Sequence, residues 1–263
     1  MQTLNYEGIK VVSSSQSTTH DALVIEAPLQ ININNTPYTV VMRTPDNDLE
    51  LVRGLLFAED IYKQEVVFHF EVIEVKKGGE TIVNISIPKE MLGKGYLNKR
   101  TLLSVSSCGI CGKQELKDLA VSGDAINLKN VLAAASIQKM FGVMQEHQKT
   151  FKRSGGSHAA ALFNANNALL SIQEDIGRHN AVDKVVGELL LKKQLNDASF
   201  MLVSGRVSYE IVSKAFIAKI PIIVAVSACS SLAVDFSKEF GICLIGFTRD
   251  EKMTIYANPN YLK

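Results

Sequence analysis

The chain has 263 residues, of which 46% are hydrophobic, and its formal net charge at pH 7 is +1. A net charge so close to zero argues against electrostatic binding to the phosphate backbone of nucleic acid, and no apolar run is long enough to span a membrane. Four cysteines without an N-terminal signal sequence indicate a reducing compartment, so we expect a cytoplasmic protein. The length allows one large domain, or one domain with a smaller appendage.

The first hundred residues have the pattern of a small α+β unit behind an N-terminal arm. Residues 1–22 are polar and rich in serine and threonine, which predicts an arm that orders by docking. Apolar alternation on both sides of Asn35–Pro37 predicts a hairpin, and a second hairpin is predicted through Lys77–Gly79. Between the two hairpins, Thr44–Asp48 caps a predicted helix. We therefore expect an α+β subdomain over residues 23–100.

The rest of the chain, residues 101–263, changes toward alternating strands and helices. Apolar residues at helical spacing predict a helix over Asn130–Lys149, and a third hairpin follows it. Asn180 is predicted to cap the next helix. Strands over 199–203, 221–226 and 242–247 then alternate with helices over 208–219 and 230–240. This alternation is typical of a largely parallel sheet that is covered on both faces.

Cys108 and Cys111 form the most informative motif, a C-x-x-C pair with a glycine after each cysteine. Small neighbours leave both sulfurs accessible, and Lys113 favours the reactive thiolate. Structural zinc would need two further ligands, with His158 or His179 as candidates. A thioredoxin-type dithiol would normally lie early in a βαβ unit, and a structural disulfide does not suit a reducing compartment. The pattern favours a nucleophilic or sulfur-carrying cysteine over these alternatives.

Serine and arginine follow the predicted strands of the last third. In open parallel sheets, ligands bind beyond the carboxyl ends of the strands, where helix N-termini offer N–H groups and arginine grips phosphate. Ordinary helix caps would explain each turn taken alone. Together the turns predict a site for a phosphorylated ligand, such as a nucleotide. The residues assigned to this site are Ser204, Arg206, Phe247, Thr248, Arg249, Asp250, Glu251 and Lys252.

Two further stretches are unusually polar for their setting. Ser154–His158 directly precedes an apolar strand, and Glu174–His179 precedes a helix. Their glycines would let the backbone approach a ligand, whereas His158, Arg178 and His179 would supply charge and proton transfer. Many histidines only brace loops by hydrogen bonds. Because each histidine lies near glycine and next to the start of a strand or helix, we predict instead that both stretches line the ligand cavity.

Several stretches resemble the formate dehydrogenase accessory sulfurtransferases, the FdhD family. They run in family order from about Ala22 to the C-terminus, and the long block Glu174–Lys184 is the most specific of them. The other stretches are Met42–Pro45, Ser106–Lys113, Gly155–Leu162, Val203–Ser208, Ile223–Ala228 and Gly246–Arg249.

The resemblance implies a sulfur carrier that a cysteine desulfurase loads with sulfur as a persulfide. The family's persulfide position matches Cys108, within the pair that includes Cys111, and its cofactor-binding segment matches Phe247–Lys252. The sulfur would pass to the molybdenum (or tungsten) cofactor, in the bis(molybdopterin guanine dinucleotide) form that the formate dehydrogenase catalytic subunit requires. This cofactor would be a bound client, and no permanent cofactor, nucleic-acid polymer or membrane is expected as a partner. Members of the family are usually homodimers.

The resemblance also implies the fold class. We expect an α/β, cytidine-deaminase-like three-layer core with a mixed sheet over 101–263, beside the smaller N-terminal α+β part. Two departures from the family pattern stand out: Cys229-Ser230 replaces Pro-Thr, and Arg249–Lys252 is more acidic than the usual tail.

Two alternative functions remain open. A zinc-binding deaminase-like protein would need an H-x-E motif, but His158 is followed by two alanines. A cofactor-binding chaperone would protect the molybdenum cofactor without moving sulfur. The two alternatives differ from a carrier in that neither needs a persulfide on Cys108.

Overall fold

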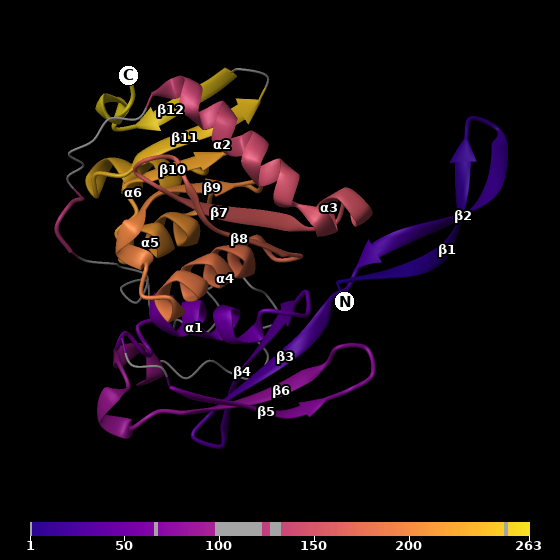
Figure 1. The fold of residues 1–263 in the computed structure, drawn as a ribbon, viewed down its shortest axis with the longest axis horizontal. Helices are drawn as coiled ribbons and strands as arrows, with labels where there is room; N and C mark the ends of the chain where they lie inside the picture. The colour runs from indigo at the N-terminus through magenta and orange to yellow at the C-terminus, as the bar shows by residue number, and fades with distance from the viewer. Residues whose placement is uncertain (1, 66–67, 98–122, 127–132, 250–251) are drawn as a thin grey trace.

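The computed structural model describes residues 2–65, 68–97, 123–126, 133–249 and 252–263. Its centre is a six-stranded sheet with the strand order β12-β11-β10-β9-β7-β8 (Figure 1). The strands are β7 (His158–Asn164), β8 (Leu169–Asp175), β9 (Ala198–Val203), β10 (Ile222–Ala225), β11 (Cys243–Arg249) and β12 (Lys252–Ala257).

The central sheet is mixed, with a parallel middle and antiparallel edges. β9, β10 and β11 are parallel neighbours, so their carboxyl ends lie together at one edge. The predicted β7–β8 hairpin is confirmed, and β7 pairs antiparallel with β9. The other edge is β12, an antiparallel strand that the sequence pattern did not reveal. The expected largely parallel sheet is therefore parallel only across its three central strands.

Helices cover both faces of this sheet (Figure 1). α4 (Arg178–Leu191), α5 (Tyr209–Ile217) and α6 (Ser231–Glu239) pack on one face, where Met201 and Val203 point. α2 (Ala134–His147) packs on the other face, against Phe200 and Leu202. The alternation along β9 follows from the two-residue period of a strand. The three-layer α/β core is therefore as expected, whereas its likeness to cytidine deaminase stays a prediction.

The N-terminal part contains the two predicted hairpins joined in one sheet. The strands are β3 (Ala27–Ile33), β4 (Thr36–Arg43), β5 (His69–Val75) and β6 (Thr81–Ser86), in the order β4-β3-β6-β5. β3 and β6 pair in parallel and thereby join the hairpins. The sheet buries its apolar residues against α1 (Asp48–Ala58), the predicted helix. Short 3₁₀ turns lie at Lys89–Met91, Lys94–Leu97, Leu195–Asp197 and Pro259–Tyr261.

Two glycines let α1 cross α4 in backbone contact. A Cβ on Gly54 would lie 1.9 Å from the carbonyl oxygen of Asp183. A Cβ on Gly187 would lie 1.9 Å from the carbonyl oxygen of Glu50. Because real side chains never approach so closely, glycine on both helices is what allows the N-terminal part to lie against the core.

The N-terminal arm is a long antiparallel hairpin of β1 (Thr3–Val12) and β2 (Ser15–Val24), and it projects away from the body (Figure 1). The predicted arm thus has regular strands, because threonine and valine favour extended structure even where they are exposed. At its base, Gln2 accepts a hydrogen bond from the Thr150 hydroxyl.

Two expectations for the helices were wrong in detail. α4 begins at Arg178 after Gly177, so Asn180 lies in its first turn and is not its cap. The Asn180 amide donates instead to the Met42 carbonyl (2.8 Å) and to Asp175 (2.9 Å). The helix predicted over Asn130–Lys149 ends at His147, and a separate α3 (Lys149–Ser154) follows.

Some predictions fall outside the described residues. They include a strand that the apolar pattern predicts over 103–106, a short helix predicted over 114–120, and the pair Cys108 and Cys111. Within the described ranges, no helix is long and apolar enough to cross a membrane.

Candidate functional site

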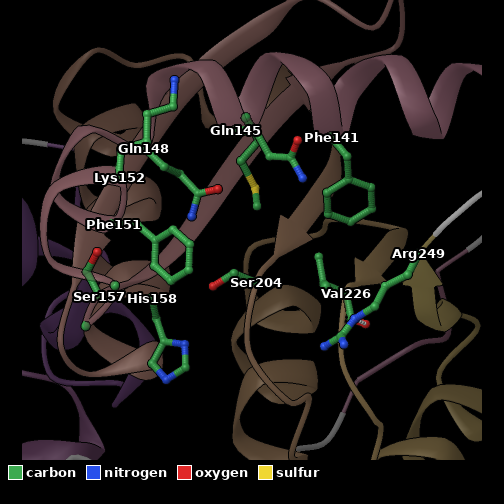
Figure 2. A pocket seen from close by; sticks show the side chains of 13 residues that line it. Phe141, Gln145, Gln148, Phe151, Lys152, Ser157, His158, Ser204, Val226 and Arg249 are labelled. Carbon is green, nitrogen blue, oxygen red and sulfur yellow. Dashed lines mark hydrogen bonds between the residues drawn. The ribbon is translucent and has the colours of Figure 1, made fainter. Parts of the chain in front are cut away.

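A cavity of about 620 Å³ opens at the carboxyl ends of β9, β10 and β11. Ser204 directly follows β9, Val226 directly follows β10, and Arg249 is the last residue of β11. The structure therefore brings together segments that the strand-end rule had predicted to meet. α2, α3 and the loop that follows α3 supply the remaining wall, with Phe141 and Phe151 as its two aromatic side chains (Figure 2).

His158 lines this cavity at the start of β7. Its position is fixed by Ser204, whose hydroxyl accepts from the backbone N–H of Ala159 at 2.9 Å. Burial lowers the pKa of His158, and the positive charges of Arg178, His179 and Arg206 lower it further. The imidazole is therefore held mainly neutral at pH 7, in a state that can accept a proton.

Gly205 allows the turn after β9 to approach both His158 and Arg178. A Cβ at this position would lie 3.2 Å from Nδ1 of His158 and 3.3 Å from the Cβ of Arg178. The turn thus places Arg206 beside the same group, where its charge contributes to the lowered pKa of His158. Arg178 and Arg206, both predicted from the sequence, therefore lie close to the cavity's histidine.

Two cations, Lys152 and Arg249, line the cavity. Arg178 and Arg206 do not line it but lie close enough to His158 for their charges to lower its pKa, and we call the four residues the cation group. Within the described part of the chain, none of them lies at ion-pair distance from a carboxylate. Arg249 Nε donates only to the Val226 carbonyl, at 3.2 Å. Unpaired cations around a cavity attract an anionic ligand, and guanidinium groups suit phosphate in particular.

Two buried polar atoms beside the predicted segments have no hydrogen-bond partner among the described residues. They are Nε of Arg178 and Oγ1 of Thr248. Thr248 is only 4% exposed, so its hydroxyl lacks the protein partner that such burial normally demands. Both residues were assigned to the ligand site from the sequence, but neither is among the residues that line the cavity.

The segment after β11 has a bulged backbone. Phe247 has φ 51° and a half-exposed ring, and the register with β12 shifts between Gly246 and Arg249. A left-handed backbone is rare for a bulky residue and is found where surrounding contacts enforce it. Here the Phe247 N–H donates to the Ser227 carbonyl at 3.0 Å. Lys252 is exposed, while Asp250 and Glu251 lie outside the described residues.

The block Glu174–Lys184 mainly fastens the N-terminal part to the core. The Asp175 carboxylate accepts from the backbone N–H of Thr44 (3.1 Å) and pairs with Lys184 at 2.8 Å, both side chains being fully buried. Lys184 Nζ also donates to the Thr44 carbonyl at 2.9 Å. We call this contact the junction. Asp175 is therefore a junction residue and does not line the cavity.

His179 also points away from the cavity lining. Its Nε2 lies 3.1 Å from Oγ of Ser208 and 3.4 Å from Oε2 of Glu210. Burial alone would raise the pKa of the Glu210 carboxyl, but the hydrogen bonds from His179 and Ser208 lower this pKa to about 2. His179 thus joins α4 to α5, and its contribution to the cavity is limited to its charge on His158.

The two cysteines that the structure describes are not reactive thiols. Burial raises the pKa of Cys229 to about 11 and that of Cys243 to about 12. The thiolate is the nucleophile, so both are inert near pH 7. In the described ranges, no group of three or more metal-ligating side chains comes together.

Several cavity residues were not predicted from the sequence. Gln145 and Gln148 belong to the helix predicted over Asn130–Lys149, and Phe151 and Lys152 lie just beyond its predicted end. The break at Gln148, which turns α3 toward the cavity, depends on contacts with Glu174. The sequence feature that could have revealed these cavity residues is the pair of glutamines that follows Phe141 on the same face of the predicted helix.

The fold and the site define an α/β protein with a cationic cavity at the carboxyl ends of its parallel strands. The chain belongs to the FdhD/NarQ family, whose family model matches residues 24–263. Among its relatives is a protein of Mycobacterium bovis named sulfur carrier protein FdhD, 38% identical over 268 residues that cover 96% of each chain. A protein of the same name from Sulfolobus acidocaldarius is 37% identical over 251 residues, which cover 95% of this chain and 94% of that one.

A solved structure has the same fold. It is a protein of Desulfotalea psychrophila, given as a formate dehydrogenase accessory protein, with a TM-score of 0.77 and coverage of 100% of both chains. Its sequence identity to this chain is 23%, so the likeness establishes the fold alone.

Proposed function

We propose that the protein is a sulfur carrier for formate dehydrogenase. In this proposal, a cysteine desulfurase places sulfur on Cys108 as a persulfide, and the sulfur passes to the molybdenum cofactor in its bis(molybdopterin guanine dinucleotide) form. The observation that carries the proposal is the cation group at the strand-end cavity, in a chain related over nearly its whole length to proteins named sulfur carriers. We expect the protein to act as a homodimer in the cytoplasm.

The cavity suits one nucleotide end of this client cofactor. Its volume of about 620 Å³ lies in the range of small-ligand sites. We assign the phosphates to Arg249, Arg206 and Arg178, whose guanidinium groups can bind phosphate oxygens in pairs. The cofactor contributes the metal centre that receives sulfur, and the chain contributes binding, orientation and proton transfer.

Sulfur transfer needs a proton acceptor and donor near the carrier cysteine. When a nucleophile attacks the outer sulfur of the persulfide, a bond from the nucleophile to that sulfur forms, the S–S bond breaks, and its electron pair stays on Cys108 as a thiolate. We assign to His158 the movement of a proton during loading and discharge, because its lowered pKa leaves it neutral at pH 7. Ser204 holds the strand end beside it through the Ala159 N–H. Cys111 is the second cysteine of the pair, and its part in the transfer is left open.

Peptide mass spectrometry tests the proposal directly. The full-length protein is incubated with a cysteine desulfurase and cysteine, and its peptides are mapped for added sulfur. We expect the adduct on the peptide that contains Cys108, and we expect Cys108→Ala to lose both the adduct and activation of the dehydrogenase. Activation that persists in Cys108→Ala without sulfur on the peptide would favour the alternative of a cofactor chaperone.

A further inference from the structure

The wall of the cavity between residues 149 and 158 is not stable by itself. It consists of the short helix α3 and a loop with two glycines, Gly155 and Gly156, and it supplies Phe151 and His158 to the cavity. A helix of six residues is far too short to persist alone in water. The residue before it, Gln148, provides no side-chain cap. Something outside the segment must therefore hold it in place.

One buried carboxylate holds both ends of this wall. Glu174, on β8, is 8% exposed. Its Oε2 accepts from the backbone N–H of Thr150 at 2.8 Å, and its Oε1 accepts from the backbone N–H of Phe151 at 2.7 Å. Oε1 also accepts from the hydroxyl of Ser157 at 2.8 Å. The first two bonds fix the start of α3, and the third fixes the residue immediately before His158.

The three contacts require a carboxylate of this length. All three partners are donors, and a carboxylate is the side-chain group that offers only acceptors. In a glutamine, the amide oxygen could still accept from Phe151 and Ser157, but the NH₂ group would face the Thr150 N–H. Two donors would then meet in a buried place, which disfavours this position of the wall. An aspartate would be one methylene too short to reach both ends.

We propose that Glu174 is a positioning residue that sets Phe151 and His158 for ligand binding in the cavity. The inference rests on the proposed function, because the ligand we expect is the nucleotide end of the client cofactor. Glu174 does not line the cavity. It acts through α3 and Ser157, so its replacement changes the geometry of the wall and leaves the chemistry of the cavity unaltered.

Calorimetry with GDP tests the proposal on the full-length protein. We expect Glu174→Gln to weaken GDP binding by about tenfold or more, the scale of a lost charged hydrogen bond. The matched control is Glu188→Gln. Glu188 also accepts from residues of β8, Ser171 (2.6 Å) and Gln173 (2.7 Å), but it lies away from the cavity wall. The control should lose thermal stability and keep wild-type GDP affinity.

Two results would overturn the proposal. The first is a Glu174→Gln protein that binds GDP as tightly as the wild type. The second is a Glu188→Gln protein whose affinity falls by as much, since a loss of stability alone would then explain the effect. Should Glu174→Gln fail to fold, Ser157→Ala removes one of the three bonds, and a few-fold weaker affinity is expected of it. Unchanged affinity in Ser157→Ala would then contradict the proposal.

Amide hydrogen exchange separates this inference from the proposed function. If the wild-type protein does not bind GDP, the nucleotide part of the proposed function fails. The exchange rates of the Thr150 and Phe151 amides still report on the wall, because Glu174 accepts from both. We expect these two amides to exchange faster in Glu174→Gln and at the wild-type rate in Glu188→Gln. Unaltered exchange in Glu174→Gln would refute the positioning role without any ligand.

Discussion

The junction and the cavity contain the same kinds of charged residue but use them in opposite ways. At the junction, Lys184 pairs with Asp175 in complete burial, and each has further hydrogen-bond partners. At the cavity, Arg249 has only a backbone carbonyl as a partner among the described residues. A charge that holds a fold together must be neutralised inside the chain, because an unpaired buried charge is costly. A charge that binds a ligand is left for the ligand to neutralise.

The largest effect should come from breaking the junction. Lys184→Met leaves the Asp175 carboxylate buried without its cation, so we expect the free energy of unfolding to fall by about 3–5 kcal/mol. Urea denaturation measures this. Lys192→Met is the control, because Lys192 pairs with Glu188 at a half-exposed position and should cost less than about 1 kcal/mol. Equal losses in the two variants would show that the junction pair contributes no more than a surface pair.

The second effect concerns the helix crossing that supports the junction. Gly187→Ala would place a Cβ against the Glu50 carbonyl, so we expect a loss of about 2–3 kcal/mol in the free energy of unfolding. Gly142→Ala is the matched control, since a Cβ there meets nothing within 4 Å. That variant should gain up to about 1 kcal/mol from helix propensity. A stable Gly187→Ala protein would show that α1 can move away from α4 without loss.

The third effect separates binding from stability at the cavity. Arg249→Ala should weaken GDP binding by about 1–3 kcal/mol, because a guanidinium that contacts phosphate makes charged hydrogen bonds. The free energy of unfolding should change little, because Arg249 pairs with no carboxylate in the described part of the chain. Calorimetry and urea denaturation of the same preparation measure the two quantities. A variant that loses stability but keeps its affinity would place Arg249 among the structural charges.

The fourth effect is a shift of the His158 pKa. Burial and then the charge of Arg178 hold this pKa below its ordinary value, so Arg178→Ala should raise it. NMR titration of the imidazole measures the midpoint, and Arg153→Ala, at an exposed position of α3, is the control. Because the folded state binds this proton less readily than the unfolded state, His158 favours folding more as pH rises toward its unfolded pKa. His158→Gln should make the free energy of unfolding less dependent on pH just below the unfolded pKa of His158. An unchanged pH dependence would contradict the lowered pKa that we assign to His158.

The sequence predicted those parts of the fold and site that depend on local pattern. The alternation of apolar and polar residues predicted both N-terminal hairpins. The tendency of ligands to bind beyond the carboxyl ends of parallel strands predicted that Ser204 and Arg249 share one cavity. The failures have a tertiary cause. Asn180 does not cap α4, which begins at Arg178, because its side-chain amide donates to the Met42 carbonyl of the N-terminal part at 2.8 Å. The helix break at Gln148 depends on Glu174, a residue of another strand that no local pattern connects to it.

The smallest effect concerns the thiol at Cys229, which lies in the turn after β10 and packs against the core on the face that α4, α5 and α6 cover. With a pKa of about 11, only on the order of one molecule in ten thousand carries a thiolate there at pH 7. We therefore expect iodoacetamide to label Cys229 slowly at pH 7 and faster as the pH rises, as peptide mass spectrometry would show. Cys229→Ser should keep sulfur loading and GDP affinity at wild-type levels. Added sulfur on the Cys229 peptide would contradict this, and it would mean that burial in the folded protein does not suppress the nucleophile. Such a result would also move the sulfur chemistry from the C-x-x-C pair to the turn after β10.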